Sequence, residues 1–242
     1  MKKQIPNTIT LLNLLCGTIS IIMLLYYNNP FLASMFIILG AVFDFFDGMM
    51  ARLLKVSSPV GKELDSLSDV VSFGVAPSLI AFYYVRISAL PNDLQNILCW
   101  IPLFMAMMSS YRLAKFNLDE RQTTSFIGLP TPANAMLWLS LPLLEYADSK
   151  GFYSIIPSFS EWMVTYLPSA YFILPVCLIT SYLLVCERPM FSLKFHNLKW
   201  KDNKIRFIFL MLVVVLIALF NLRAIPMIIC LYILMSLLCC KQ

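Results

Sequence analysis

The sequence predicts an all-α integral membrane protein with about eight transmembrane helices, and three observations lead to this prediction. Of its 242 residues, 60% are hydrophobic and only 13% are charged, about half the charged share of a soluble domain. Apolar runs recur along the whole chain, each near the ~20 residues that a helix needs to cross a bilayer. The basic residues, finally, are distributed unequally between alternate connections.

The apolar runs define the predicted helices and leave no room for a soluble domain, so residues 1–242 are expected to form a single membrane domain. The predicted spans are residues 6–27, 30–50, 67–86, 95–114, 126–147, 163–186, 206–222 and 224–240.

Turn-forming residues separate these helices. Asn29-Pro30 predicts a tight turn after the first span, and Pro59 with Gly61 breaks the chain after the second. A third helix is expected to begin near Lys62. The connection at residues 188–204 is basic with interleaved aromatic residues, which is typical of a segment attracted to anionic lipid and gives no support to nucleic-acid binding.

The basic residues predict the orientation of the chain. An even number of spans puts both termini on one side of the membrane. Of the 18 Lys and Arg residues, only Arg86, Lys150 and Arg223 fall on the opposite side. The positive-inside rule therefore places both termini in the cytoplasm, and the expected location is the cell (inner) membrane.

Four aspartates lie at residues 44–69, on the cytoplasmic side of this topology. Asp44 and Asp47 are three residues apart on one helix, and Asp65 and Asp69 are four apart on the next. Each spacing puts the pair on one helix face, and a short turn between antiparallel helices can bring the faces together. Ionisable residues inside apolar spans usually mark functional sites.

Four converging carboxylates repel one another, so they require protons or divalent cations. An all-oxygen ligand set favours magnesium, manganese or calcium over zinc. Neighbouring residues indicate a phosphate-bearing ligand: Gly48 permits close approach to the helix, Ala51 keeps the same face open, and Arg52 offers a planar donor fork. In a membrane, this combination suits a lipid-linked diphosphate.

These residues form the pattern D-x2-D-G-x2-A-R-x8-G-x3-D-x3-D without departure. The pattern resembles the signature of the CDP-alcohol phosphatidyltransferases. Within that family the chain is most similar to the branch that uses serine, the CDP-diacylglycerol–serine O-phosphatidyltransferases. Four stretches carry this similarity: IPNTITLLNLLCGTISI at 5–21, LDSLSDVVSFGVAPS at 64–78, YRLAKFN at 111–117 and FIGLPTPANA at 126–135.

The resemblance implies a role for each motif residue. Asp44 and Asp65 would bridge two Mg²⁺ or Mn²⁺ ions, Asp47 would hold one of them, and Asp69 would hold the other and serve as general base. The residues expected to contact CDP-diacylglycerol are Asn7, Thr8, Ile9, Thr10, Gly48, Ala51, Arg52, Ser58 and Gly61. Candidates for holding the acceptor or the lipid phosphate are Arg112, Lys115 and Asn117.

The resemblance also implies an architecture and a reaction. A six-helix catalytic core would span about residues 5–186, followed by a C-terminal helix pair at about 206–240, and the protein would be a homodimer. L-serine would displace CMP from CDP-diacylglycerol at the cytoplasmic face.

Alternative functions remain open at this point. The same chemistry could use glycerol phosphate or inositol phosphate as the acceptor, although a phosphorylated acceptor calls for more basic residues than the span ends offer. An intramembrane prenyltransferase also uses paired aspartates, but does not require the glycines and arginine at these spacings. A divalent-cation transporter is a third hypothesis, for which acids deep in several spans would be typical.

Overall fold

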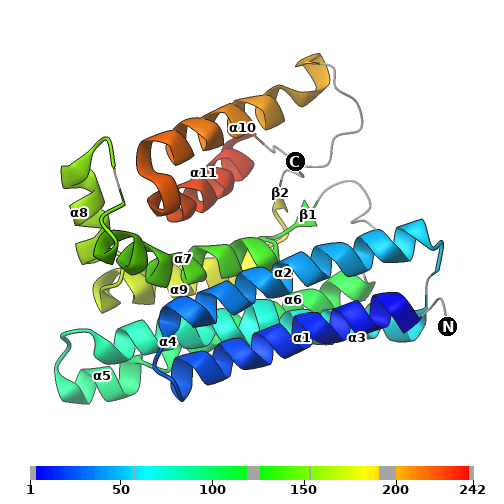
Figure 1. Ribbon diagram of the computed structural model, residues 1–242, viewed down its shortest axis with the longest axis horizontal. Helices are drawn as coiled ribbons and strands as arrows, with labels where there is room; N and C mark the ends of the chain where they lie inside the picture. The colour runs from blue at the N-terminus through cyan, green and yellow to red at the C-terminus, as the bar shows by residue number, and fades with distance from the viewer. Residues whose placement is uncertain (1–3, 57, 119–125, 153, 191–199, 240–242) are drawn as a thin grey trace.

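The computed structural model is a bundle of helices, most of which run along one direction, with a C-terminal helical hairpin along one side (Figure 1). It describes residues 4–56, 58–118, 126–152, 154–190 and 200–239. The first half contains α1 (Gln4–Leu25), α2 (Pro30–Leu53), α3 (Pro59–Asp69), the π-helix η1 (Val70–Val75), α4 (Ala76–Ile87), α5 (Asn92–Leu98), the 3₁₀ turn η2 (Ile101–Leu103) and α6 (Phe104–Leu118). The second half contains β1 (Phe126–Ile127), α7 (Thr131–Ser149), α8 (Pro157–Tyr166), α9 (Ala170–Val185), β2 (Pro189–Met190), α10 (Trp200–Phe220), the 3₁₀ turn η3 (Asn221–Arg223) and α11 (Ala224–Cys239).

The predicted all-α membrane fold is confirmed, and each of the eight predicted spans overlaps helix, although residues 126–147 begin in β1 and residues 163–186 include the break between α8 and α9. Among the described residues, five helical stretches are long and apolar enough to cross a membrane, or six if α8 and α9, which meet at 78°, form one span. The last of these stretches, residues 203–238, covers most of α10 and α11, which fold back on each other at η3 (Figure 1). The chain is a multi-pass membrane protein.

Two details differ from the predicted architecture. β1 and β2, of two residues each, form an antiparallel pair in which Phe126 faces Met190, so short backbone pairing joins two interhelical connections. The third helix begins at Pro59 rather than near Lys62. The central part of the basic connection, residues 191–199, lies outside the described residues.

Helix α7 lies at the centre of the packing. It contacts α2 and α4 on one side and α11 on another, and twelve of its 19 residues are buried. Trp138 and Leu144 are part of the main hydrophobic core. Because α7 is covered by protein, it can carry polar residues such as Asn134 and Glu145. It is not among the helical stretches of the described residues that are apolar enough to cross a membrane by themselves.

The turn between α2 and α3 is specified by local backbone chemistry. At the end of α2, the Lys55 N–H donates to Arg52 O and the Val56 N–H to Ala51 O, which is a Schellman motif with Lys55 in the left-handed region (φ 50°). At the start of α3, Ser58 Oγ accepts the Gly61 N–H at 2.9 Å. Both helix ends are thereby satisfied, and the chain reverses within a few residues.

Helix α1 packs very closely on the segment after Asp69. A Cβ atom on Gly17 would lie 2.5 Å from Ser72 Oγ and 2.8 Å from Ser72 Cα. Ser72 belongs to η1, a π-helical segment within an otherwise α-helical span, and such segments are frequent at functional sites. Only glycine at position 17 permits this approach.

Some of the residues predicted to lie at the cytoplasmic face contact one another. Lys62 Nζ of α3 donates to Asn117 O of α6 at 2.8 Å, and Lys115 pairs with Glu187 at 2.6 Å. Arg223, predicted on the opposite side, instead pairs with Asp148 at 2.9 Å.

A methyl group at position 17 tests this packing. We expect Gly17→Ala to lower the thermal unfolding temperature in detergent, because overpacking against a backbone atom costs about 1–3 kcal/mol. Gly48→Ala is the matched control, since a Cβ atom there meets no other atom within 4 Å. Equal unfolding temperatures for the two variants would contradict the tight α1–η1 contact.

Candidate active site

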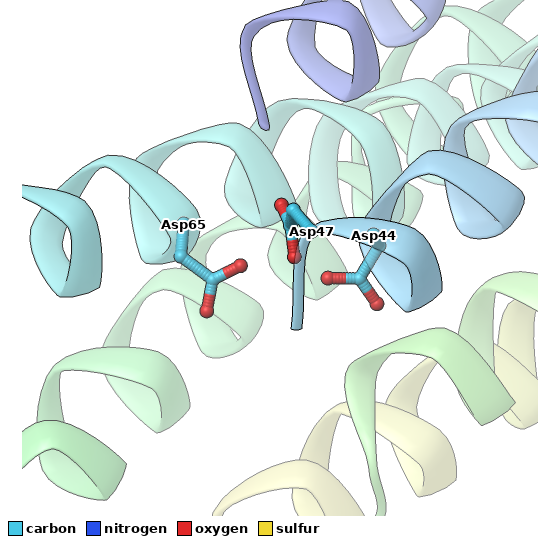
Figure 2. A group of neighbouring side chains, drawn as sticks. All are labelled: Asp44, Asp47 and Asp65. Carbon is cyan, nitrogen blue, oxygen red and sulfur yellow. The ribbon is translucent and has the colours of Figure 1, made fainter. Parts of the chain in front are cut away.

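Three aspartates converge where the end of α2 faces α3. Asp44, Asp47 and Asp65 each offer a carboxylate oxygen, and these oxygens all lie within 4.8 Å of one another. In Figure 2 the side chains of Asp44 and Asp65 extend toward each other from two helices, with Asp47 between them. The convergence predicted from the two spacings is therefore present for these three residues.

Asp69 lies one helical turn after Asp65 and is 9% exposed. It is not one of the three grouped carboxylates, but it interacts electrostatically with Asp44, Asp65 and Asp47. Its Oδ1 accepts a hydrogen bond from Asn13 Nδ2 at 3.2 Å. The fourth carboxylate thus lies next to the cluster and is bonded to α1.

Helix α1 also bonds directly to the cluster. Thr10 Oγ1 donates to Asp47 Oδ2 at 2.6 Å and lies 3.0 Å from Pro6 O. Thr10 was predicted to contact nucleotide, and the structure shows it orienting a carboxylate. Sequence analysis missed Asn13, although its position three residues after Thr10 puts both side chains on one face of α1.

The composition of the cluster fits a hard divalent cation. Its donors are carboxylate oxygens, which Mg²⁺ and Mn²⁺ prefer. Among the described residues, the ion pairs join Lys115 to Glu187 and Arg223 to Asp148, and neither includes an aspartate of the cluster. Two carboxylates ~4 Å apart repel by about 4 kcal/mol at an effective dielectric of ~20, so a counter-cation would stabilise the arrangement.

A cleft of about 210 Å³ adjoins the cluster. It is lined by Pro6, Asn7, Thr10, Asp47, Gly48, Ala51, Val56, Ser58, Gly61, Lys62 and Asp65. Six of the nine predicted CDP-diacylglycerol contacts are among these residues, namely Asn7, Thr10, Gly48, Ala51, Ser58 and Gly61. The cleft therefore lies between the starts of α1 and α3 and the end of α2, with two of the aspartates in its wall.

The other three predicted contacts do not line the cleft. Thr8 and Ile9 lie on α1 outside it, and the Thr8 hydroxyl donates to Gln4 O. Arg52 is exposed, and its Nε donates to Gly48 O at 3.0 Å. The cleft lining also includes Lys62, which was not predicted. Lys62 precedes Asp65 by three residues, so the spacing alone could have indicated that both lie on one helix face.

The two motif glycines act differently. A Cβ atom on Gly61 would lie 2.9 Å from Asn7 Oδ1 and 3.0 Å from Ser58 Oγ, so this glycine lets α1 approach the start of α3. Gly48 has open space beside it, which leaves room in the cleft wall.

The three acceptor candidates differ in their surroundings. Arg112 is 6% exposed. Its Nη1 lies 3.4 Å from Thr131 Oγ1, its Nε has no partner among the described residues, and it interacts electrostatically with Asp69. Lys115 is paired with Glu187, and Asn117 bonds to Ser66 at 2.9 Å. Of the three, only Arg112 retains an unused buried donor.

Comparison with known proteins relates this chain to one protein family. Residues 3–166 match the family model described as CDP-alcohol phosphatidyltransferase. The chain is also similar to several proteins named CDP-diacylglycerol–serine O-phosphatidyltransferase. One, from Bacillus subtilis, is 45% identical over 132 residues, which are 54% of this chain and 71% of that protein.

For more distant relatives with the same name, the alignment covers a smaller share of the relative's length. The protein from Helicobacter pylori (strain ATCC 700392 / 26695) is 34% identical over 145 residues, 58% of this chain and 57% of the relative. The protein from Saccharomyces cerevisiae is 37% identical over 163 residues, 61% of this chain and 55% of the relative. The family match extends over more than half of the chain and includes every aspartate of the site, so the chain belongs to the CDP-alcohol phosphatidyltransferase family.

Proposed function

We propose that this protein transfers the phosphatidyl group of CDP-diacylglycerol to the hydroxyl of L-serine and releases CMP. The observation that carries the proposal is the cleft whose wall contains Asp47 and Asp65 together with most of the motif residues. The similarity to proteins named for this reaction, over about half of the chain, supports the choice of serine.

Two Mg²⁺ or Mn²⁺ ions are proposed to be held by Asp44, Asp47, Asp65 and Asp69. Bound there, they would neutralise the diphosphate and make CMP a better leaving group. Thr10 contributes by fixing the orientation of Asp47. The nucleotide would lie in the adjoining cleft, where Asn7, Ser58 and Lys62 supply polar groups and Gly48 supplies space.

Asp69 is proposed to be the general base. It takes the proton of the serine hydroxyl, and the serine oxygen then forms a bond to the phosphatidyl phosphorus. The bond from that phosphorus to the CMP oxygen breaks, CMP leaves, and the proton passes from Asp69 to water. General-base catalysis of this kind contributes about 10²- to 10⁴-fold to a rate.

Arg112 is the proposed partner of the serine carboxylate. A buried guanidinium without a full set of acceptors is costly, and a carboxylate matches its donor fork. Its Nε has no partner among the described residues, and its guanidinium interacts electrostatically with Asp69, the proposed base. Lys115 and Asn117, which bond to other protein groups, are proposed to hold α6 against its neighbours instead.

We further propose that residues 1–242 form one membrane domain, with a catalytic core at about 5–186 and the helix pair at about 206–240 added to it. The unequal distribution of basic residues supports a cytoplasmic active site with both termini on that side. The homodimer remains a proposal that rests on the family resemblance.

The acceptor assay tests the reaction itself. We expect purified protein in detergent micelles with CDP-diacylglycerol and Mn²⁺ or Mg²⁺ to release CMP when L-serine is added, and Asp69→Asn to lose about 10²- to 10⁴-fold of that rate. Glycerol 3-phosphate and inositol phosphate are the comparison acceptors. Release with one of them instead would overturn serine as the acceptor. Mn²⁺ uptake into vesicles without CMP release would favour a transporter.

The role of Arg112 is tested by Arg112→Lys, which keeps the charge but loses the planar fork. We expect the KM for serine to rise about 10- to 100-fold, since a hydrogen bond to a charged group contributes about 1.5–3 kcal/mol. The KM for CDP-diacylglycerol should hardly change. Lys115→Met is the control, with both constants near wild type. A selective rise in the KM for CDP-diacylglycerol would instead assign Arg112 to the lipid phosphate.

A further inference from the structure

Helix α1 presents two hydrogen-bond donors to the aspartates, and each reaches a different one. Thr10 Oγ1 bonds to Asp47, in the wall of the cleft, whereas Asn13 Nδ2 bonds to Asp69. The two donors are three residues apart and therefore on one helix face. One helix thus orients two of the proposed metal ligands, one of which is also the proposed general base.

The Asn13 side chain is confined on several sides. It is fully buried, with 0% exposure. Ser72 Oγ donates to the Asn13 backbone O at 3.0 Å, which ties this turn of α1 to η1. Gly40 of α2 is also close, since a Cβ atom there would come within 2.9 Å of Asn13 Oδ1. The glycine therefore leaves just enough room for the amide.

The amide of Asn13 has an unusual hydrogen-bond balance. Its Nδ2 bonds to Asp69, but its buried Oδ1 has no partner among the described residues. An unpaired buried acceptor is unfavourable, and most buried polar groups avoid it. An apolar side chain of similar size would pack here without that cost. The amide therefore contributes something that packing alone does not require.

We infer that Asn13 is a positioning residue for Asp69. This inference rests on the proposed function, in which Asp69 removes the proton from serine. The Nδ2–H of Asn13 holds Oδ1 of Asp69 and so restricts rotation of the carboxyl group about its terminal torsion. Oδ2 is then left in a defined direction to accept the proton. Catalysis gains from such pre-orientation because the reacting groups need little rearrangement.

A purely structural role makes a different prediction. If Asn13 only anchored α1 to the following segment, then removal of the neighbouring Ser72 hydrogen bond would have a similar effect. Ser72 bonds to the same residue of α1, but its hydroxyl donates to the Asn13 backbone O rather than to an aspartate. Ser72→Ala is therefore the matched control. Thr10→Val serves as a second comparison, because Thr10 bonds to a different carboxylate.

The test measures kcat, the KM values for CDP-diacylglycerol and serine, direct Mn²⁺ binding by calorimetry, and the thermal unfolding temperature in detergent. For Asn13→Leu we expect kcat to fall about 10- to 100-fold, the effect of losing a hydrogen bond to a charged group. Both KM values and the unfolding temperature should stay near wild type. Asn13→Asp, which keeps the shape but removes the donor, should lower kcat at least as far.

The two comparison variants should behave differently. Ser72→Ala should retain the wild-type kcat, and Thr10→Val should weaken Mn²⁺ binding. The inference is overturned if Asn13→Leu and Ser72→Ala lower kcat equally, or if Asn13→Leu changes KM rather than kcat. Absence of CMP release by the wild-type protein with every acceptor would instead overturn the proposed function, and this inference with it.

Discussion

The close approach of α1 to the α2–α3 pair puts hydrogen-bond donors against carboxylates that are surrounded by apolar helices. Small residues at helix interfaces permit such contacts in membranes, and here Gly17, Gly40 and Gly61 all lie where a Cβ atom would meet another helix or its side chains. With α1 further away, the hydroxyl of Thr10 and the amide of Asn13 could not reach the aspartates. The site therefore depends on backbone packing as much as on its charged residues.

The α2–α3 turn meets a second requirement of the site, namely that α2 and α3 present the correct faces to each other. The Schellman motif at Lys55 and the cap at Ser58 end one helix and begin the next within a few residues. Because both ends are defined, the faces that carry Asp47 and Asp65 are opposed rather than rotated apart. The same turn forms one wall of the cleft, so one short connection organises both the carboxylate cluster and the space next to it.

Helix packing away from the aspartates connects the helices of the site to the rest of the protein. The buried helix α7 connects the first helices to the C-terminal hairpin, which forms a second hydrophobic cluster around Leu184, Phe209 and Tyr232. Tyr232 of that hairpin interacts electrostatically with Arg112. The C-terminal helices thus reach the surroundings of the proposed acceptor site, although their sequence carries no part of the motif.

The sequence by itself determined the helical membrane class, the family and the facing aspartates, because hydropathy and the spacings of Asp44, Asp47 and Asp65 are local properties of one or two helices. Six of the nine predicted CDP-diacylglycerol contacts also line the cleft: Gly48, Ala51, Ser58 and Gly61 lie on or beside those same helices, and Asn7 and Thr10 lie on α1. Only the tertiary structure decided which predicted site residues bond to groups outside the site, as Lys115 does to Glu187. It also decided which residues without a predicted role belong to the site, as Asn13 does. Helical periodicity states which face a residue occupies, but the partner of that face is chosen by long-range packing between helices.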